Sequence, residues 1–133
     1  MNKLDTRHNS NFTPPLSLLP LMAKAKNCYL LWIIYYKNIP KFHKYTLGQK
    51  IDTIFIEAIE GIAIATFLPR EEKHPWVKLV IRKVDTLKIL LMVLWEAKSI
   101  DNKKYLNISE KLDEIVRMLG GWNGQLTKHF DKN

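Results

Sequence analysis

The sequence has few of the residues that disulfide-stabilised or membrane-embedded folds require. Its 133 residues include a single cysteine, Cys28, so no internal disulfide can form and a reducing compartment is expected. The closest approach to a membrane span, residues 27–36, is about half the length that a span needs. Asp5 and three early prolines interrupt any signal-peptide pattern. We therefore expect a cytoplasmic protein that does not enter a membrane.

Acidic residues are scarce in the first part of the chain. Residues 1–50 contain eight Lys or Arg and one acid, Asp5, whereas residues 51–95 contain six of each. The net charge of +8 therefore belongs almost entirely to the N-terminal part. Such an asymmetry suggests a polyanion partner, most commonly nucleic acid. The alternative is that surface lysines merely keep a small protein soluble.

Alternating strand patterns are also missing, and apolar residues instead recur at spacings of three and four. They do so over four segments: 22–39, 47–68, 77–94 and 105–122. Because the connections are short, successive helices should run antiparallel, which predicts an all-α, up-down-up-down four-helix bundle. We expect the bundle domain at 18–127, between a flexible N-terminal tail at 1–17 and a C-terminal tail at 128–133.

Local signals give provisional helix ends. Thr46 with Gln49 fits a capping box at the start of the second helix. Pro75 fits the first turn of the third helix, where its missing N–H costs nothing. Asp101 is a suitable N-cap for the fourth helix. The pair Gly120–Gly121 marks where that helix weakens or ends.

The second and third helices carry more apolar residues than one bundle can bury. Apolar side chains around most of a helix indicate burial on more than one side. A domain of this size cannot cover both faces of two helices, so we expect a homo-oligomer or association with a partner protein. The expected interface residues are Phe55, Ile56, Ile59, Ile89 and Met92.

Patterns of catalytic or metal-binding residues are lacking. Glu71 and His74 have the Glu-x-x-His spacing of di-iron bundles, but this spacing occurs once and in a predicted connection. The four histidines are scattered and form no ligand pattern. Cys28 lies among apolar residues, which is typical of a core residue rather than a nucleophile. We expect no metal, no cofactor, no catalytic residue and no enzymatic activity.

Two motifs carry a family resemblance. Residues 39–49, IPKFHKYTLGQ, resemble the junction between the first two helices of Avd-like four-helix bundle proteins. Residues 112–122, LDEIVRMLGGW, resemble the closing motif of that family. The layout agrees from about residue 18 to 127, and the chain is identified as a member of this family. The family includes the accessory variability determinant of diversity-generating retroelements and bundle proteins encoded in insertions of 23S rRNA genes.

The resemblance implies a basic, barrel-shaped homopentamer without chemistry of its own. Such a protein associates with a reverse transcriptase and its structured template RNA, and supports error-prone cDNA synthesis. The candidate nucleic-acid contacts lie in the junction and on the third helix: Lys37, Lys41, His43, Lys44, Lys78, Arg82, Lys83 and Lys88. Aromatic residues beside the junction could stack on unpaired bases, although Tyr36 fits the core better: Tyr35, Tyr36, Phe42 and Tyr45.

The chain departs from the family pattern at three positions. Many accessory members have two arginines four residues apart on the third helix, where this chain has Lys88 and Met92. Val116 stands where the family often has glycine. The alternative function is that of a structural or interaction protein, from an rRNA insertion or an orphan oligomer, without a reverse transcriptase. The resemblance covers both functions, and the basic N-terminal half favours the first.

Overall fold

The computed structural model describes residues 19–131, and the side chains of residues 20–128. These residues form four long helices and no strand, which confirms the all-α prediction: α2 (Leu19–Tyr36), α4 (Gln49–Phe67), α5 (Arg70–Glu96) and α6 (Asn102–Asp131). Between α2 and α4 lie the short helix α3 (Lys41–His43) and the π-helical turn η3 (Lys44–Gly48). The expected tail at 1–17 lies outside the described residues.

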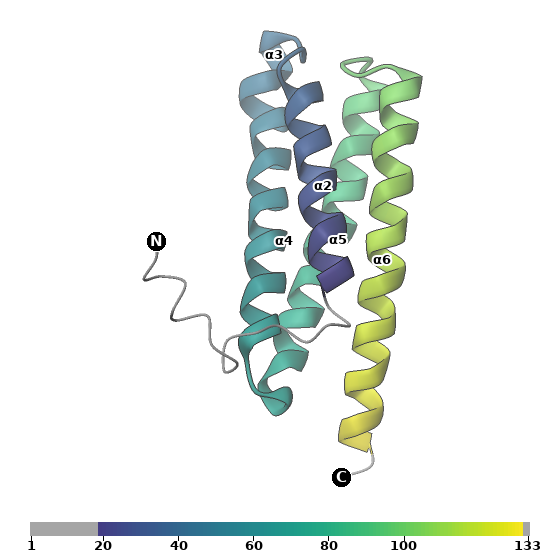
Figure 1. Ribbon diagram of the computed structural model, residues 1–133. Coiled ribbons are helices and arrows are strands. Elements are labelled where there is room, and N and C mark those ends of the chain that lie inside the picture. Colours follow the sequence, from purple (N-terminus) through teal and green to yellow (C-terminus); the bar gives the residue numbers. More distant parts are fainter. Residues whose placement is uncertain (1–18, 132–133) are drawn as a thin grey trace, which may run out of the picture.

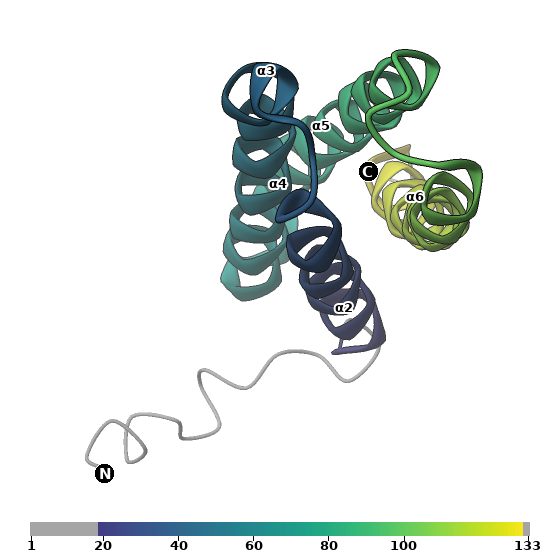
Figure 2. The ribbon, with the colours of Figure 1, turned by 90° about the horizontal axis from the view of Figure 1, so that it is seen from above.

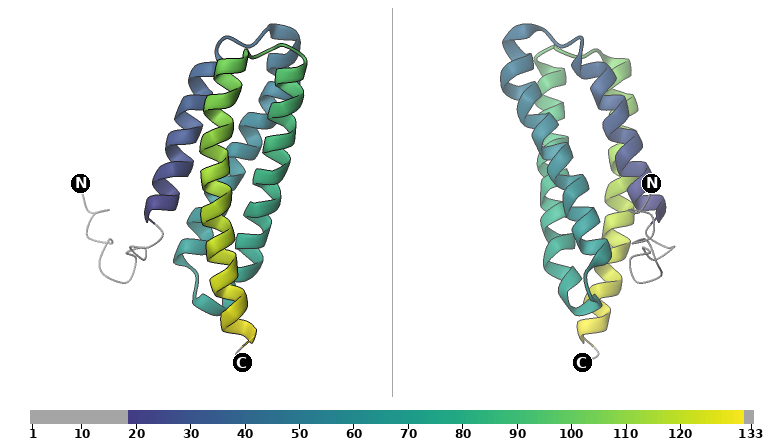
Figure 3. Two further views of the ribbon diagram at one scale, coloured as in Figure 1. Left: turned by 90° about the vertical axis from the view of Figure 1, so that its right-hand side faces the viewer. Right: turned by 60° about the vertical axis from the view of Figure 1, so that its left-hand side comes forward.

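The four helices pack as an antiparallel bundle in which sequence neighbours are also neighbours in space. The contacting pairs are α2 with α4, α4 with α5, α5 with α6, and α6 with α2. Seen from above, α2 and α5 therefore lie diagonally across the bundle (Figure 2). α3 and the connection from α5 to α6 lie at one end of the bundle (Figure 1). The start of α2 and the end of α6 point toward the other end (Figure 3).

The apolar faces predicted from the sequence form the core, except that the buried face of α2 is displaced by one residue near its end. On α5 the residues that recur at spacings of three and four are all buried: Val77, Val80, Val84, Leu87, Leu91 and Leu94. On α2 the buried stripe includes Tyr35, while Tyr36 and Tyr29 are only half-buried. The expectation that Tyr36 belongs to the core is therefore half right, since Tyr36 stacks against the buried Trp32 with ring centroids 5.4 Å apart.

The start of α4 differs from the predicted capping box. The Thr46 hydroxyl donates backwards to the Phe42 carbonyl oxygen over 3.2 Å, and no side chain caps the helix. The chain is already helical from Lys41 and continues through η3 into α4. The capping prediction is wrong because Thr46 lies within a helical turn, where its hydroxyl bonds a preceding carbonyl group instead of a following N–H.

The connection from α4 to α5 is shorter than expected. α5 begins at Arg70, so Pro75 lies inside the helix rather than in its first turn, and His74 is helical. The preceding turn is held by Lys73, whose ammonium group donates to the Ala65 and Thr66 carbonyl oxygens at 2.6 and 2.9 Å. These carbonyl groups lie in the last turn of α4, beyond the last N–H donors of the helix itself, and that of Ala65 also accepts from the Leu68 N–H at 3.4 Å. A lysine of α5 thus caps the C-terminus of α4.

Of the two predicted ends of α6, the start is confirmed and the C-terminal end is wrong. Asp101 is confirmed as the N-cap, since its carboxylate accepts a hydrogen bond from the Lys104 N–H at 2.9 Å. The end predicted at Gly120–Gly121 is wrong, because α6 continues to Asp131 and includes part of the expected C-terminal tail. The apolar period also continues, with Trp122 and Leu126 buried beyond the glycines.

Candidate nucleic-acid interface

The junction between α2 and α4 is a fixed structure. The N–H groups of His43 and Lys44 donate to the Pro40 carbonyl oxygen at 3.0 and 2.8 Å, closing a helical turn directly after the proline. The Tyr36 hydroxyl donates to the Lys44 carbonyl oxygen at 3.2 Å. Gly48 lies so close to Tyr36 that a Cβ atom there would be 3.0 Å from the ring. These contacts hold the junction against the end of α2.

A hydrogen bond joins the junction to the connection between α5 and α6. His43 Nδ1 and Ser99 Oγ lie 2.6 Å apart, and Ser99 is buried. Since His43 is itself half-buried and engaged in this bond, it positions the two loops and is not a free surface contact. The bond brings residues 37–48 and 97–101 together into one surface, which we call the junction end.

The α5–α6 connection contains a lysine in a backbone conformation that favours glycine. Lys98 has φ of 66°. The Ser99 N–H donates to the Leu94 carbonyl oxygen at 3.0 Å, and the Lys98 N–H donates to the Trp95 carbonyl oxygen at 2.8 Å. This is the Schellman pattern of helix termination, whose left-handed position is usually a glycine. The pattern leaves the Lys98 side chain exposed at the junction end.

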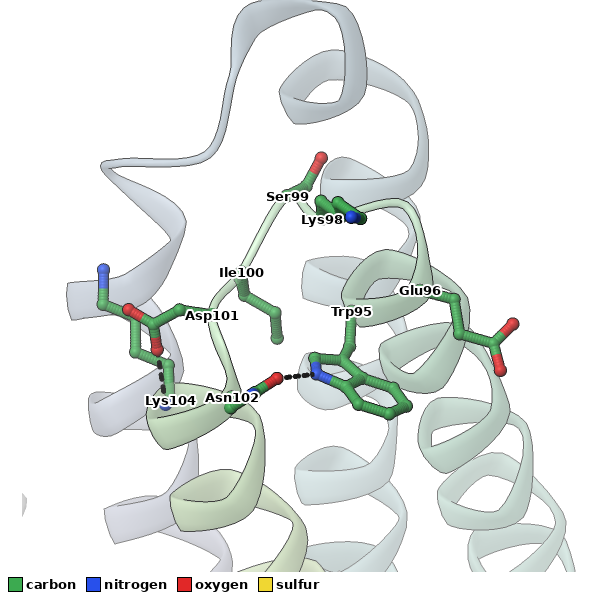
Figure 4. Close-up of a pocket in the computed structure, with 8 residues that line it drawn as sticks. All are labelled: Trp95, Glu96, Lys98, Ser99, Ile100, Asp101, Asn102 and Lys104. Atoms are coloured by element: carbon green, nitrogen blue, oxygen red, sulfur yellow. Dashed lines mark hydrogen bonds between the residues drawn. The ribbon is translucent and has the colours of Figure 1, made fainter.

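An open hollow of about 600 Å³ lies beside this connection and is lined by residues 95–96, 98–102 and 104. In it, the Trp95 indole N–H donates to the Asn102 side-chain oxygen at 2.7 Å (Figure 4). Trp95 also stacks on Tyr105, with ring centroids 4.7 Å apart. Sequence reasoning missed this hollow, because the Asp101 N-cap signal locates the loop but not the packing around it.

Lysines predominate over acids at the junction end. Residues 37–50 contain four lysines and no acid, and residues 96–104 contain three lysines and two acids. By contrast, residues 67–76 at the other end contain two cations and two acids. Four of the eight Lys or Arg of residues 1–50 therefore lie on the acid-free segment at this end of the bundle.

The predicted basic residues do not form a single cluster. Lys37 and Lys41 are exposed at the junction end. The Lys44 ammonium group lies there too, 5.7 Å from the Tyr36 ring centroid and 5.9 Å from that of Tyr45. Lys78 and Arg82 are exposed on α5, but 14 to 18 residues before its end at Glu96. At 1.5 Å per residue this places them about 21–27 Å away along the helix axis.

The two other predicted contacts on α5 are ion-paired. The Lys83 ammonium group lies 3.0 Å from the Glu57 carboxylate of α4. The Lys88 ammonium group lies 2.8 Å from the Asp113 carboxylate of α6. A phosphate would have to displace a carboxylate at both positions. Neither residue is as available to a polyanion as the junction lysines are.

Apolar surface remains exposed on both sides of the bundle. Of the expected interface residues, Ile56, Ile89 and Met92 are exposed and Ile59 is half-buried. Phe55 is only 3% exposed because it packs in the core between Tyr29 and Trp32, so it offers almost nothing to another chain. Sequence reasoning missed two exposed residues of α2: Leu30 and Ile34.

Metal sites and membrane spans are two other features that helical proteins carry, and both concern here the part of the chain that the structure describes. No three His, Cys, Asp or Glu side chains of this part come together in a way that could hold a metal ion. None of its helices combines the length and the apolar character needed to cross a membrane.

Comparison with protein-family models gives a match over most of the chain. A family model described as bAvd-like matches residues 22–126, which include all of the junction end and most of each long helix. No curated protein and no solved structure matches the chain.

Proposed function

Because the chain belongs to the bAvd-like family, we propose that it is a non-enzymatic accessory subunit of a diversity-generating retroelement. In this role it associates in the cytoplasm with the reverse transcriptase and with the structured template RNA or its cDNA, and it supports mutagenic cDNA synthesis. The observation that carries the proposal is the lysine-rich junction end of a bundle from this family. Avd-like bundles are not a known family of enzymes, which agrees with an accessory role.

The junction end suits binding to the phosphate backbone. Lys37, Lys41 and Lys44 lie on one short segment that contains no acid, so their positive potentials add. Each lysine that neutralises a phosphate releases a counterion and steepens the dependence of affinity on salt. Such contacts position nucleic acid without reading its sequence. Binding should therefore show little sequence preference and should weaken steeply as salt is added.

Charge-reversal variants test this surface. Lys41→Glu/Lys44→Glu should weaken binding to structured RNA and make the slope of log affinity against log salt about two units shallower. Lys111→Glu/Lys128→Glu makes the same change in net charge on exposed positions of α6 and is the matched control. Equal losses in the two double variants would mean that only the overall charge matters, and would remove the junction end from the proposal.

We also propose that the chain assembles into a ring, a pentamer by family resemblance. The exposed apolar residues Leu30 and Ile34 on α2 lie diagonally across the bundle from Ile89 and Met92 on α5. The α5 residues border a groove of about 320 Å³ between α5 and α6. Two different apolar faces on opposite sides of one chain favour head-to-tail association, which forms a ring when the rotation between neighbouring copies closes.

A mixing experiment tests head-to-tail assembly. Ile34→Asp disables the α2 face and Ile89→Asp disables the α5 face, so each variant alone should lose the ring mass in light scattering. A mixture should form a one-to-one dimer, because one intact α2 face can still meet one intact α5 face. A monomer mass for the wild-type chain at micromolar concentration would contradict the proposed ring. Dimers of either variant alone would contradict head-to-tail pairing.

The DNA around the gene distinguishes the accessory role from its alternative. A reverse transcriptase gene with a template repeat and a variable repeat nearby supports the accessory role, and the reverse transcriptase should then co-purify with this chain. A location inside a 23S rRNA gene would instead favour the structural or interaction protein. The family match is compatible with both locations.

A further inference from the structure

Two aromatic rings at the junction end are left uncovered. Phe42 is 70% exposed and Tyr45 is 62% exposed, the highest values among the large hydrophobic residues that are exposed in the described part of the chain. Tyr35 and Tyr36, the other aromatic residues considered for stacking on bases, are buried or half-buried. Exposed rings on a short turn contribute nothing to the core, so their position calls for another explanation.

The backbone holds both rings in place. Phe42 lies in α3 and Tyr45 in the π-helical turn η3. π-Helical turns are rare in proteins, and those that occur are often found at functional sites. The Phe42 ring packs against the His43 ring, with centroids 4.3 Å apart, and His43 is bonded to Ser99. The two exposed rings are therefore displayed on a fixed surface, which lowers the entropy lost when a ligand stacks on them.

Lysines lie close to these rings in space or in sequence. The Lys44 ammonium group lies 5.9 Å from the Tyr45 ring centroid, and Lys41 directly precedes Phe42. Lys98 directly precedes Ser99, and Ser99 is hydrogen-bonded to His43, the residue after Phe42. Lys98 also has a left-handed backbone that glycine would adopt without strain. Strained residues of this kind concentrate at functional sites, which supports a role for the Lys98 ammonium group at the junction end.

We propose that the junction end binds unpaired nucleotides of RNA or DNA, with bases stacked on Phe42 and Tyr45 and phosphates contacted by Lys41, Lys44 and Lys98. This inference rests on the proposed nucleic-acid-binding function and names the form of nucleic acid that it takes. Aromatic rings beside lysines are the combination that single-strand binding proteins use. In a duplex the bases are already stacked on one another, so their faces are not available to the exposed rings.

Fluorescence anisotropy with labelled 12-nucleotide oligomers tests the proposal. Oligo-U and oligo-dT provide unpaired RNA and DNA, and a 12-base-pair hairpin provides the duplex. Phe42→Ala/Tyr45→Ala should weaken binding to both single strands by about tenfold or more and leave duplex affinity and the salt slope unchanged. Lys98→Ala should weaken single-strand binding and make its salt slope shallower by about one unit.

The controls separate stacking from loss of apolar surface or of structure. Ile64→Ala/Leu106→Ala removes two other exposed apolar side chains and should leave binding unchanged. Phe42→Leu/Tyr45→Leu keeps apolar bulk without the rings and should bind single strands as weakly as the alanine variant. Circular dichroism should give wild-type helical content for every variant, since exposed changes perturb stability little.

Distinct results would overturn the inference. Equal affinity of the wild type for single strand and duplex, or an unchanged single-strand affinity in Phe42→Ala/Tyr45→Ala, would refute stacking and leave the proposed function standing. Loss of binding to anionic lipid vesicles in the alanine variant, with single-strand binding intact, would assign the rings to a membrane surface instead. No binding of any nucleic acid at low salt would refute both the inference and the proposed function.

Discussion

Gly61 of α4 packs directly against Val80 of α5, and alanine at this position should destabilise the bundle. A Cβ atom on Gly61 would lie 2.5 Å from Val80 Cγ2, well inside normal contact distance. Val80 is 1% exposed, and a valine side chain is stiff at χ1, so it cannot swing away. Overpacking of this kind costs about 1–3 kcal/mol. The gain in helix propensity, up to about 1 kcal/mol, offsets only part of that cost.

Gly120→Ala is the matched control, because it makes the same change inside α6 with nothing within 4 Å of the new Cβ atom. It should stabilise the fold by about 0.5–1 kcal/mol. Thermal melts of both variants at one protein concentration should show melting temperatures shifted in opposite directions. In a Val80→Ala background, which removes the clashing methyl group, Gly61→Ala should become stabilising. A higher melting temperature for Gly61→Ala in the wild-type background would refute this packing argument.

Three further predictions concern single side chains. Trp122→Ala should lower the free energy of unfolding by about 3–5 kcal/mol in denaturant titrations, because Trp122 is only 7% exposed; an unchanged value would mean that the indole is not part of the core. Lys98→Gly should raise the free energy of unfolding by about 1 kcal/mol, because glycine adopts the left-handed backbone without strain, whereas Lys98→Ala should not raise it. Burial raises the pKa of the Cys28 thiol to about 12, so a thiol reagent at pH 8 should label it only after unfolding, and rapid labelling of the folded protein would contradict this.

The helices could be predicted because their signals are local and periodic. Apolar spacing alone identified the buried faces of α4 and α5, and a single carboxylate, Asp101, identified the start of α6. The error at Gly120 came from reading glycine as a helix terminator while the apolar period continued through Trp122 to Leu126. The period was the better guide, because tertiary packing of one helix face outweighs the low propensity of exposed glycines.

The candidate site was harder to predict because its geometry depends on distant residues. Nothing near Lys83 or Lys88 in the sequence reveals their carboxylate partners, which come from neighbouring helices. The bond between His43 and Ser99 joins residues 56 positions apart. The junction lysines could be identified because they share one short segment. The separation of Lys78 and Arg82 from them follows from the predicted antiparallel topology, which places the start of α5 at the opposite end of the bundle.

The proposed accessory role is tested most directly by cDNA synthesis. The reverse transcriptase encoded beside this gene would be assayed on its own template RNA without this chain, with the wild type, with Lys41→Glu/Lys44→Glu and with the Lys111→Glu/Lys128→Glu control. We expect abundant cDNA with the wild type and the control, and little with the junction variant or without the chain. Equal cDNA in all four reactions, or flanking DNA that encodes no reverse transcriptase, would contradict the proposed role.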